Sequence, residues 1–319
     1  MSRNNPRKRR TNRRKPGHHG RGAPKVSRSE RRNAHGLVAS TDSPESGVLD
    51  QRGVRLNRWL AERGVDSRRK CDALVQEGSV EVNGEIRLDP GYRVQPDDEV
   101  RVDGQPVRDV RRLYYLFYKP RGVLCTADKR ETRPRVGDLV DHLVPSRVYP
   151  VGRLDEDSEG LLLLTNDGDF AHMMMHPSFG VPKTYVVFTP LIVRQQDLDA
   201  IREGAWIDGQ KVVPERVKIV RRTKAGTSLE LVLREGRNRE VRRLLARHGF
   251  GVKRLKRVRI GELGVKGVRR GGLRPLTRIE RDRLVAVAQG AAMEEEASST
   301  ASAKPSSRPR RAAIRKRRS

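Results

Sequence analysis

Residues 149–170 read YPVGRLDEDSEGLLLLTNDGDF, and this stretch predicts a buried strand beside a strongly acidic loop. Residues 161–164 are wholly apolar and stand between Gly160 and the Asn-Asp-Gly of residues 166–168, which is typical of a buried strand followed by a tight turn. Four acids crowd the preceding loop: Asp155, Glu156, Asp157 and Glu159. Carboxylates repel phosphate, so we expect either that each is neutralised or that one takes part in chemistry.

Further strand-like runs flank this stretch, between residues 112 and 290. An apolar run at residues 113–118 is broken by KPRG at 119–122 and resumes at 123–126. Additional strands are expected at 183–188 (KTYVVF), 229–235 (LELVLRE) and 252–260. Residues 236–239 turn into a helix with an apolar stripe of Val241, Leu244 and Leu245. Strands and helices are therefore interspersed throughout this large domain.

Residues 52–105 predict a small module of two short helices and a twisted sheet. Apolar residues recur at helical spacing over residues 56–60, and Ser67 is suited to cap a second helix. Short alternating strands follow, and Asn83-Gly84 between them is the strongest two-residue hairpin signal.

Three cations, Arg68, Arg69 and Lys70, follow the Ser67 cap directly. A helix N-terminus already presents N–H donors to anions, so this cluster favours phosphate binding. The alternative is a solvated basic helix end.

The charge of the chain is concentrated at its two ends. The 319 residues carry a net charge of +29. Residues 1–33 hold 13 Lys/Arg and one acid, and residues 297–319 hold 8 Lys/Arg and no acid. We expect residues 1–51 and 291–319 to be disordered basic arms, because they offer little to bury. They could hold a nucleic-acid backbone or simply aid solubility.

The composition also excludes several classes of protein. No run approaches the ~18 apolar residues of a membrane span, and the first 35 residues contain no apolar signal-peptide core. Cys71 and Cys125 alone cannot form a disulfide framework or a zinc site. These observations favour a cytoplasmic protein that binds a polyanion and makes no membrane contact.

The small module resembles the S4 RNA-binding domain through RLNRWLAERGVDSRRKCDALVQEGSVEVNG. The resemblance implies that Arg68, Arg69 and Lys70 face structured RNA. Cys71 stands where that family usually carries a small residue, so we interpret it as a buried apolar group rather than a reactive thiol.

The whole of residues 52–285 resembles a pseudouridine synthase of the branch that modifies bacterial ribosomal RNA. The ordered motifs are KPRGVLCT, GRLDEDSEGLLLLTNDGDFAHMMMHP, PKTYVV and EGRNREVRRLLARHGFGVKRLKRVRIGELGV. The resemblance implies an α+β fold: an S4 domain over residues 52–105 and a catalytic domain over residues 112–290, built on a mixed, largely antiparallel sheet. The implied partner is ribosomal RNA or a pre-ribosomal particle. We expect the protein to act as a monomer.

The family pattern assigns three catalytic positions. Asp155 in GRLD matches the catalytic aspartate, Tyr185 in KTY the tyrosine against the target base, and Arg242 the basic residue that pairs with the aspartate. Arg153 matches an arginine that can fill the gap left by a flipped base. Glu240 departs from the expected Gln. We expect the following further cations to bind RNA: Arg237, Arg239, Lys253, Arg254, Lys256 and Arg257.

Pseudouridine formation moves no electrons and imports no group, so we expect no small-molecule cofactor and no metal. Large-subunit RNA is the first expectation for the substrate, with small-subunit RNA as an alternative. A noncatalytic RNA-binding assembly factor is a third possibility, which the presence of Asp155 and Tyr185 disfavours. A calcium loop starting at Asp155 fails because its twelfth position is Asn166. His172 and His176 lack a third ligand and are expected to be structural.

Overall fold

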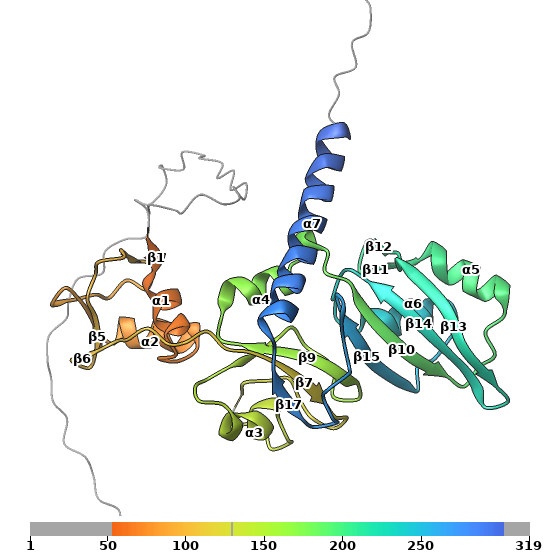
Figure 1. The fold of residues 1–319 in the computed structure, drawn as a ribbon, viewed down its shortest axis with the longest axis horizontal. Helices are drawn as coiled ribbons and strands as arrows, with labels where there is room; N and C mark the ends of the chain where they lie inside the picture. Colours follow the sequence, from red (N-terminus) through yellow and green to blue (C-terminus); the bar gives the residue numbers. More distant parts are fainter. Residues whose placement is uncertain (1–52, 129, 303–319) are drawn as a thin grey trace, which may run out of the picture. The chain divides into compact units, whose positions relative to one another are not determined.

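A computed structural model of the chain describes the backbone of residues 53–128 and 130–302, with side chains up to residue 290 (Figure 1). The whole of the expected N-terminal arm (residues 1–51), residue 52 and residues 303–319 lie outside the described residues. Residues 291–302, expected to belong to a disordered tail, continue helix α7 (Arg278–Ser302). Their Ala- and Glu-rich sequence has high helix propensity, which explains the continuation.

The small domain has the predicted pair of helices and a small sheet. Its elements are β1 (Val54–Arg55), α1 (Leu56–Glu62), α2 (Arg68–Gln76), β2 (Val80–Val82), β3 (Glu85–Ile86), β4 (Arg93–Val94), β5 (Val100–Val102) and β6 (Gln105–Pro106). The Ser67 side chain accepts the Lys70 N–H and caps α2 as predicted. Asn83 and Gly84 both have positive φ and join β2 to β3. Cys71 is fully buried in this core, and burial raises the pKa of its thiol.

The large domain is built on one mixed sheet, with strand order β13-β14-β10-β15-β9-β7-β17. Its strands are β7 (Tyr114–Lys119), β8 (Tyr149–Val151), β9 (Glu159–Thr165), β10 (Lys183–Thr189), β13 (Arg216–Thr223), β14 (Gly226–Leu233), β15 (Arg254–Ile260), β16 (Leu263–Gly264) and β17 (Leu273–Pro275). Among these described strands, only β9 and β15 pair in parallel. The expected α+β fold and largely antiparallel sheet are therefore confirmed.

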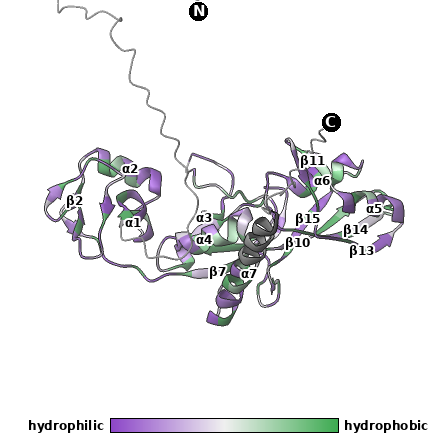
Figure 2. Cartoon of the chain, turned by 90° about the horizontal axis from the view of Figure 1, so that it is seen from above, coloured by the Kyte–Doolittle hydropathy of each residue, from purple (hydrophilic) through white to green (hydrophobic). Residues whose placement is uncertain are grey.

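Helices pack against the sheet both on the β10 side and on the β7 side of the β9–β15 pair. They are α3 (Val136–Val140), α4 (Gly168–Met175), α5 (Gln195–Glu203), α6 (Glu240–Arg247) and α7, and the hairpin β11 (Ala205–Ile207)–β12 (Gln210–Val212) lies against α6. One core joins β10, β14, α5 and α6, and another joins β9, α4 and α7. Figure 2 shows hydrophilic and hydrophobic residues interspersed along these elements, as expected where one face is buried.

Gly160 permits the close approach of β9 and β15. It lies directly opposite Arg257 and has a φ of +118°. A Cβ there would stand 2.2 Å from the Arg257 carbonyl oxygen. Only glycine fits this junction without moving the backbone.

Two local expectations were wrong. Residues 123–126 do not form a strand, because Leu124 makes only an isolated bridge with Arg135. After β9 the chain enters α4 instead of a tight turn, since the Asp167 carboxylate accepts the N–H groups of Asp169 and Phe170 and caps a helix. Within the described residues, no helix is long and apolar enough to span a membrane.

Candidate active site

The acidic loop connects β8 to β9 and directs Asp155 into a cavity. Leu154 is buried in the main core, and the Asp155 carbonyl accepts the Ser158 N–H at 3.1 Å. A buried neighbour and a turn therefore fix the backbone on either side of Asp155. Its carboxylate is 28% exposed and lines a cavity of about 440 Å³.

Tyr185 reaches the same cavity from β10. Its side chain is 8% exposed and packs in the core that also contains Leu154. Across the sheet Tyr185 stands opposite Leu231 of β14 and Arg257 of β15. The aromatic ring is thus held by a central strand while remaining part of the cavity wall.

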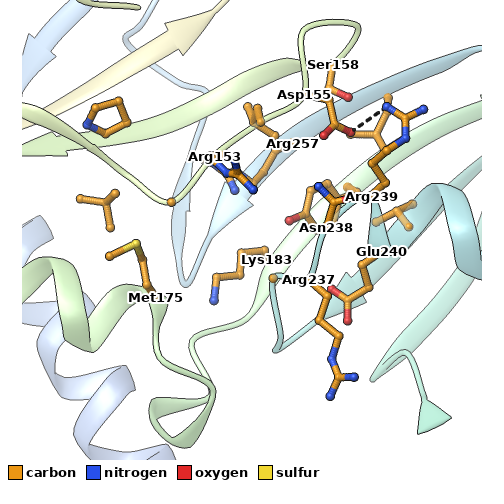
Figure 3. Close-up of a pocket in the computed structure, with 18 of the residues that line it drawn as sticks. Arg153, Asp155, Ser158, Met175, Lys183, Arg237, Asn238, Arg239, Glu240 and Arg257 are labelled. Atoms are coloured by element: carbon orange, nitrogen blue, oxygen red, sulfur yellow. Dashed lines mark ion pairs between the residues drawn. The ribbon is translucent and has the colours of Figure 1, made fainter. Parts of the chain in front are cut away.

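Each acid of the loop has an arginine partner. Arg239 Nη1 lies 3.5 Å from Asp155 Oδ2, as the dashed line in Figure 3 marks, and Arg242 Nη2 lies 2.9 Å from Asp157 Oδ2. The outer acids pair as Glu156–Arg133 at 2.8 Å and Glu159–Arg270 at 3.5 Å. Neutralisation, one of the two outcomes expected from the sequence, is therefore found for all four.

Arg242 is close to Asp155, but its tighter contact is with Asp157. Arg242 Nε lies 3.9 Å from Asp155 Oδ2, whereas its Nη1 donates to the Val252 carbonyl at 2.8 Å. The side chain is 11% exposed, and burial lowers the pKa of its guanidinium. The predicted proximity is present, yet Arg239 makes the shorter ion pair with Asp155. The sequence had assigned Arg239 only to RNA, because ion-pair choice depends on the loop conformation.

Two buried charges in the cavity wall were not expected from the sequence. Glu240 is 5% exposed, and burial, reinforced by Glu235, raises the pKa of its carboxyl to about 7. Lys183 is 7% exposed and donates to the Arg234 carbonyl, while burial and then Arg257 lower the pKa of its amine to about 8. Lys183 stands two residues before Tyr185, so the two-residue period of a strand could have placed both on one face.

The predicted RNA-binding residues fall into different environments. The exposed ones are Arg68, Arg69, Lys70, Arg153, Arg239, Lys253 and Arg254. Lys70 pairs with Asp66 at 2.8 Å, and the partly buried Lys256 lies over the Tyr118 ring. Arg153, Arg237 and Arg239 line the cavity (Figure 3). The cations at residues 68–70 and 253–254 are therefore accessible, while three arginines share the cavity wall with Asp155 and one of them, Arg239, contacts it.

Arg257 does not fit the expectation of an outer phosphate contact. It is 5% exposed, and its Nε donates to the Leu161 carbonyl at 2.7 Å. Its side chain faces the cavity because Arg257 lies opposite Tyr185 in the sheet. The alternating pattern of residues 252–260 did not distinguish this inward position, since both faces of β15 carry cations.

The residues considered for metal binding have other roles in the structure. In the described part of the chain, no three His, Cys, Asp or Glu side chains gather as a metal site would require. His176 Nδ1 lies 2.7 Å from Ser178 Oγ and accepts the Ser178 N–H, which caps a short 3₁₀ turn. His172 packs against the His176 ring.

The sequence and fold match known proteins over most of the described chain. An S4 domain model matches residues 54–100, and an RNA pseudouridylate synthase model matches residues 113–247. The ribosomal large subunit pseudouridine synthase B of Bacillus subtilis is 39% identical over 236 residues, which cover 73% of this chain and 96% of the relative. An uncharacterized RNA pseudouridine synthase of Mycobacterium tuberculosis (strain ATCC 25618 / H37Rv) is 40% identical, covering 71% of this chain and 91% of the relative.

A solved structure agrees with these matches. A crystal structure of a pseudouridylate synthase aligns with a TM-score of 0.51 and 28% identity, covering 73% of this chain and all of the other. Together these matches identify an RNA-modifying isomerase. The chain belongs to the RNA pseudouridylate synthase family and carries an S4 domain.

Proposed function

We propose that this enzyme isomerises a specific uridine of large-subunit ribosomal RNA. The family supplies the reaction, and the Bacillus subtilis relative, named for the large subunit, matches over nearly its full length. The S4 domain supports a structured RNA substrate. We place the division between the RNA-binding and catalytic domains between residues 105 and 112, and propose that a cytoplasmic monomer acts without a small-molecule cofactor.

The observation that carries the catalytic assignment is the shared cavity of Asp155 and Tyr185, with Arg239 and Arg242 beside the carboxylate. In the reaction the N1–C1′ bond of uridine breaks, the uracil turns, and a C5–C1′ bond forms. The proton on C5 leaves and N1 gains one, so the isomerisation is balanced without a co-reactant. The Asp155 carboxylate acts as the nucleophile or stabilises the cationic sugar while the uracil is detached.

Tyr185 offers a flat ring on which the uracil stacks and a hydroxyl for proton transfer at C5. A base inside a stacked helix cannot reach this cavity, so the uridine flips out at a cost of a few kcal/mol. Arg153 is exposed at the cavity wall, and we propose that it occupies the space that the base leaves. The exposed cations Arg68, Arg69, Lys70, Lys253 and Arg254 then hold flanking phosphates.

Mapping pseudouridines in both ribosomal RNAs, with and without the gene, tests this function. We expect one large-subunit uridine to remain unmodified in the deletion strain, and plasmid-borne wild type to restore it where Asp155→Asn does not. If a small-subunit pseudouridine is lost instead, the proposed reaction stands but its substrate is small-subunit ribosomal RNA. An unchanged map would indicate a noncatalytic RNA-binding factor.

A further inference from the structure

Two buried polar atoms in the cavity wall lack hydrogen-bond partners. Glu240 Oε1 and Arg257 Nη2 are both inaccessible, and neither bonds to any residue that the structure describes. Both residues are 95% buried and line the cavity that holds Asp155 and Tyr185. An unsatisfied buried polar group costs about 1–3 kcal/mol, and proteins keep few of them. Two in the wall of one cavity point to a ligand that bonds to both when the neighbouring side chains shift to admit it.

The backbone fixes where these two groups are presented. Arg257 stands opposite Tyr185 in the sheet and lines the cavity, and its Nε is anchored on the Leu161 carbonyl at 2.7 Å, while Nη2 has no partner. Glu240 is the first residue of α6, and its N–H donates to the Arg237 carbonyl. Lys183 experiences the charges of both Arg257 and Glu240, so the donor and the acceptor belong to one local cluster. Figure 3 shows all three side chains around the same cavity.

We propose that Glu240 and Arg257 read the Watson–Crick edge of the flipped uracil, an inference that rests on the proposed function. Glu240 Oε1 accepts the N3–H of uracil, and Arg257 Nη2 donates to a neighbouring carbonyl oxygen. Uracil presents acceptor, donor and acceptor along O2, N3–H and O4. Cytosine has an acceptor at N3, so it would face the Glu240 carboxylate lone pair to lone pair. The pair therefore selects uracil over cytosine.

The same pair suits both ends of the reaction. The detached uracil must exchange N1 for C5 at the sugar, and half a turn about the axis through N3 and C6 makes this exchange. That turn also exchanges O2 with O4 and leaves N3–H in place. Glu240 can therefore hold N3–H before and after the turn, while Arg257 meets one carbonyl oxygen in the substrate and the other in the product.

The test compares uridine with N3-methyluridine at the mapped target position of a synthetic RNA. Single-turnover rates are measured at about pH 8.5, where a carboxyl with a pKa of about 7 is ionised. Wild type should discriminate against the methylated base by at least about 100-fold, because the analogue leaves Glu240 unpaired. Glu240→Ala removes the acceptor and makes room for the methyl group, so this ratio should fall below about 10. Glu240→Gln retains an acceptor oxygen and should keep most of the discrimination.

The surface variant Glu262→Ala, whose side chain is 67% exposed, is the matched control and should behave as wild type. The ratio cancels any effect of the methyl group on RNA folding. A ratio near one in wild type, or an unchanged ratio in folded Glu240→Ala, would overturn the proposal, and the first result does not depend on the variant folding. If wild type fails to isomerise the mapped uridine itself, the proposed function is wrong instead.

The role of Arg257 as the hydrogen-bond donor to the base is tested with 2-thiouridine and 4-thiouridine. In these analogues a sulfur atom, which accepts hydrogen bonds poorly, replaces one carbonyl oxygen. Wild type should be slower on both, and Arg257→Lys should reduce this penalty, since lysine cannot hold the Leu161 carbonyl and the base together. An equal thio penalty in a folded Arg257→Lys enzyme would remove Arg257 from base recognition.

Discussion

Arg242→Ala should slow isomerisation and destabilise the catalytic domain at the same time. The Arg242 side chain is 11% exposed and links α6 to two other segments, the acidic loop and the residue that precedes β15 by two positions. Nη1 donates to the Val252 carbonyl at 2.8 Å, Nη2 lies 2.9 Å from Asp157 Oδ2, and Nε lies 3.9 Å from Asp155 Oδ2. Truncation removes all three contacts and leaves the shape of α6 unchanged.

The expected loss of stability follows from these contacts. Breaking a fully buried ion pair costs about 3–5 kcal/mol, but Asp155 and Asp157 are 28% and 41% exposed, so water partly replaces the lost partner. We expect about 1–2 kcal/mol from the ion pairs and about 1 kcal/mol from the Val252 carbonyl. The sum of about 2–3 kcal/mol corresponds to a fall in Tm of roughly 5–10 °C for a domain of this size. Removing a donor beside the reacting carboxylate should lower the single-turnover rate about 100-fold.

Thermal unfolding and single-turnover kinetics on the mapped RNA check both effects. Arg242→Lys should lie between wild type and Ala, because a point charge cannot make the three contacts together. Arg239→Ala is the matched control: its side chain is 47% exposed, so its loss should cost less than about 1 kcal/mol. In double-mutant cycles, Arg242→Ala should couple more strongly to Asp157→Asn than to Asp155→Asn. Wild-type rate and Tm in the Ala variant would refute the reasoning.

Four other changes test separate parts of the site. Asp155→Asn should abolish turnover with RNA affinity nearly unchanged, measured on one RNA; turnover at the wild-type rate would remove Asp155 from the mechanism. Tyr185→Phe should keep more RNA affinity than Tyr185→Ala yet lose product formation, and a full single-turnover rate in Phe would confine Tyr185 to stacking. Burial raises the pKa of Glu240 from 4.5 to about 7, so between these pH values the native state retains a proton that the unfolded chain releases. The free energy of unfolding of the wild type should therefore fall as the pH rises from about 4.5 to 7. Glu240→Gln should remove up to about 3 kcal/mol of this fall when the free energy of unfolding is measured by denaturant titration at each pH. Parallel pH profiles for wild type and Glu240→Gln would contradict this prediction. Gly160→Ala should destabilise the domain by roughly 3 kcal/mol because its Cβ meets the Arg257 backbone, and an unchanged Tm would show that the junction can relax.

Local patterns in the sequence predicted most of the elements. The Ser67 cap, the Asn83-Gly84 hairpin and the apolar run at residues 161–164 depend on neighbours within a few positions, and all three are confirmed. The run at residues 123–126 was predicted as a strand, but a strand requires a partner elsewhere in the chain. Only Leu124 finds one, in a single bridge with Arg135. Sequence pattern cannot supply that information.

The candidate site shows the same division between local and distant information. Asp155 and Tyr185 were recognisable from their motifs, and the structure brings both to one cavity. The choice of arginine partner was not recognisable, because Arg239 and Arg242 are three residues apart and both reach the loop. Arg257 was assigned to RNA because a basic residue in an alternating strand gives no sign of which face is covered. Its burial depends on β9, nearly a hundred residues earlier in the sequence.

The parallel junction of β9 and β15 connects these distant parts of the site. β9 follows the acidic loop directly, and β15 lies beside β10, which carries Tyr185. Gly160 allows the two backbones to meet, and Arg257 then bonds to the Leu161 carbonyl across the junction. A displacement of β9 would therefore move Asp155 relative to Tyr185 and at the same time break the hydrogen bond from Arg257 to the Leu161 carbonyl. This coupling explains why a glycine with no side chain to offer stands five residues after Asp155, the proposed catalytic aspartate.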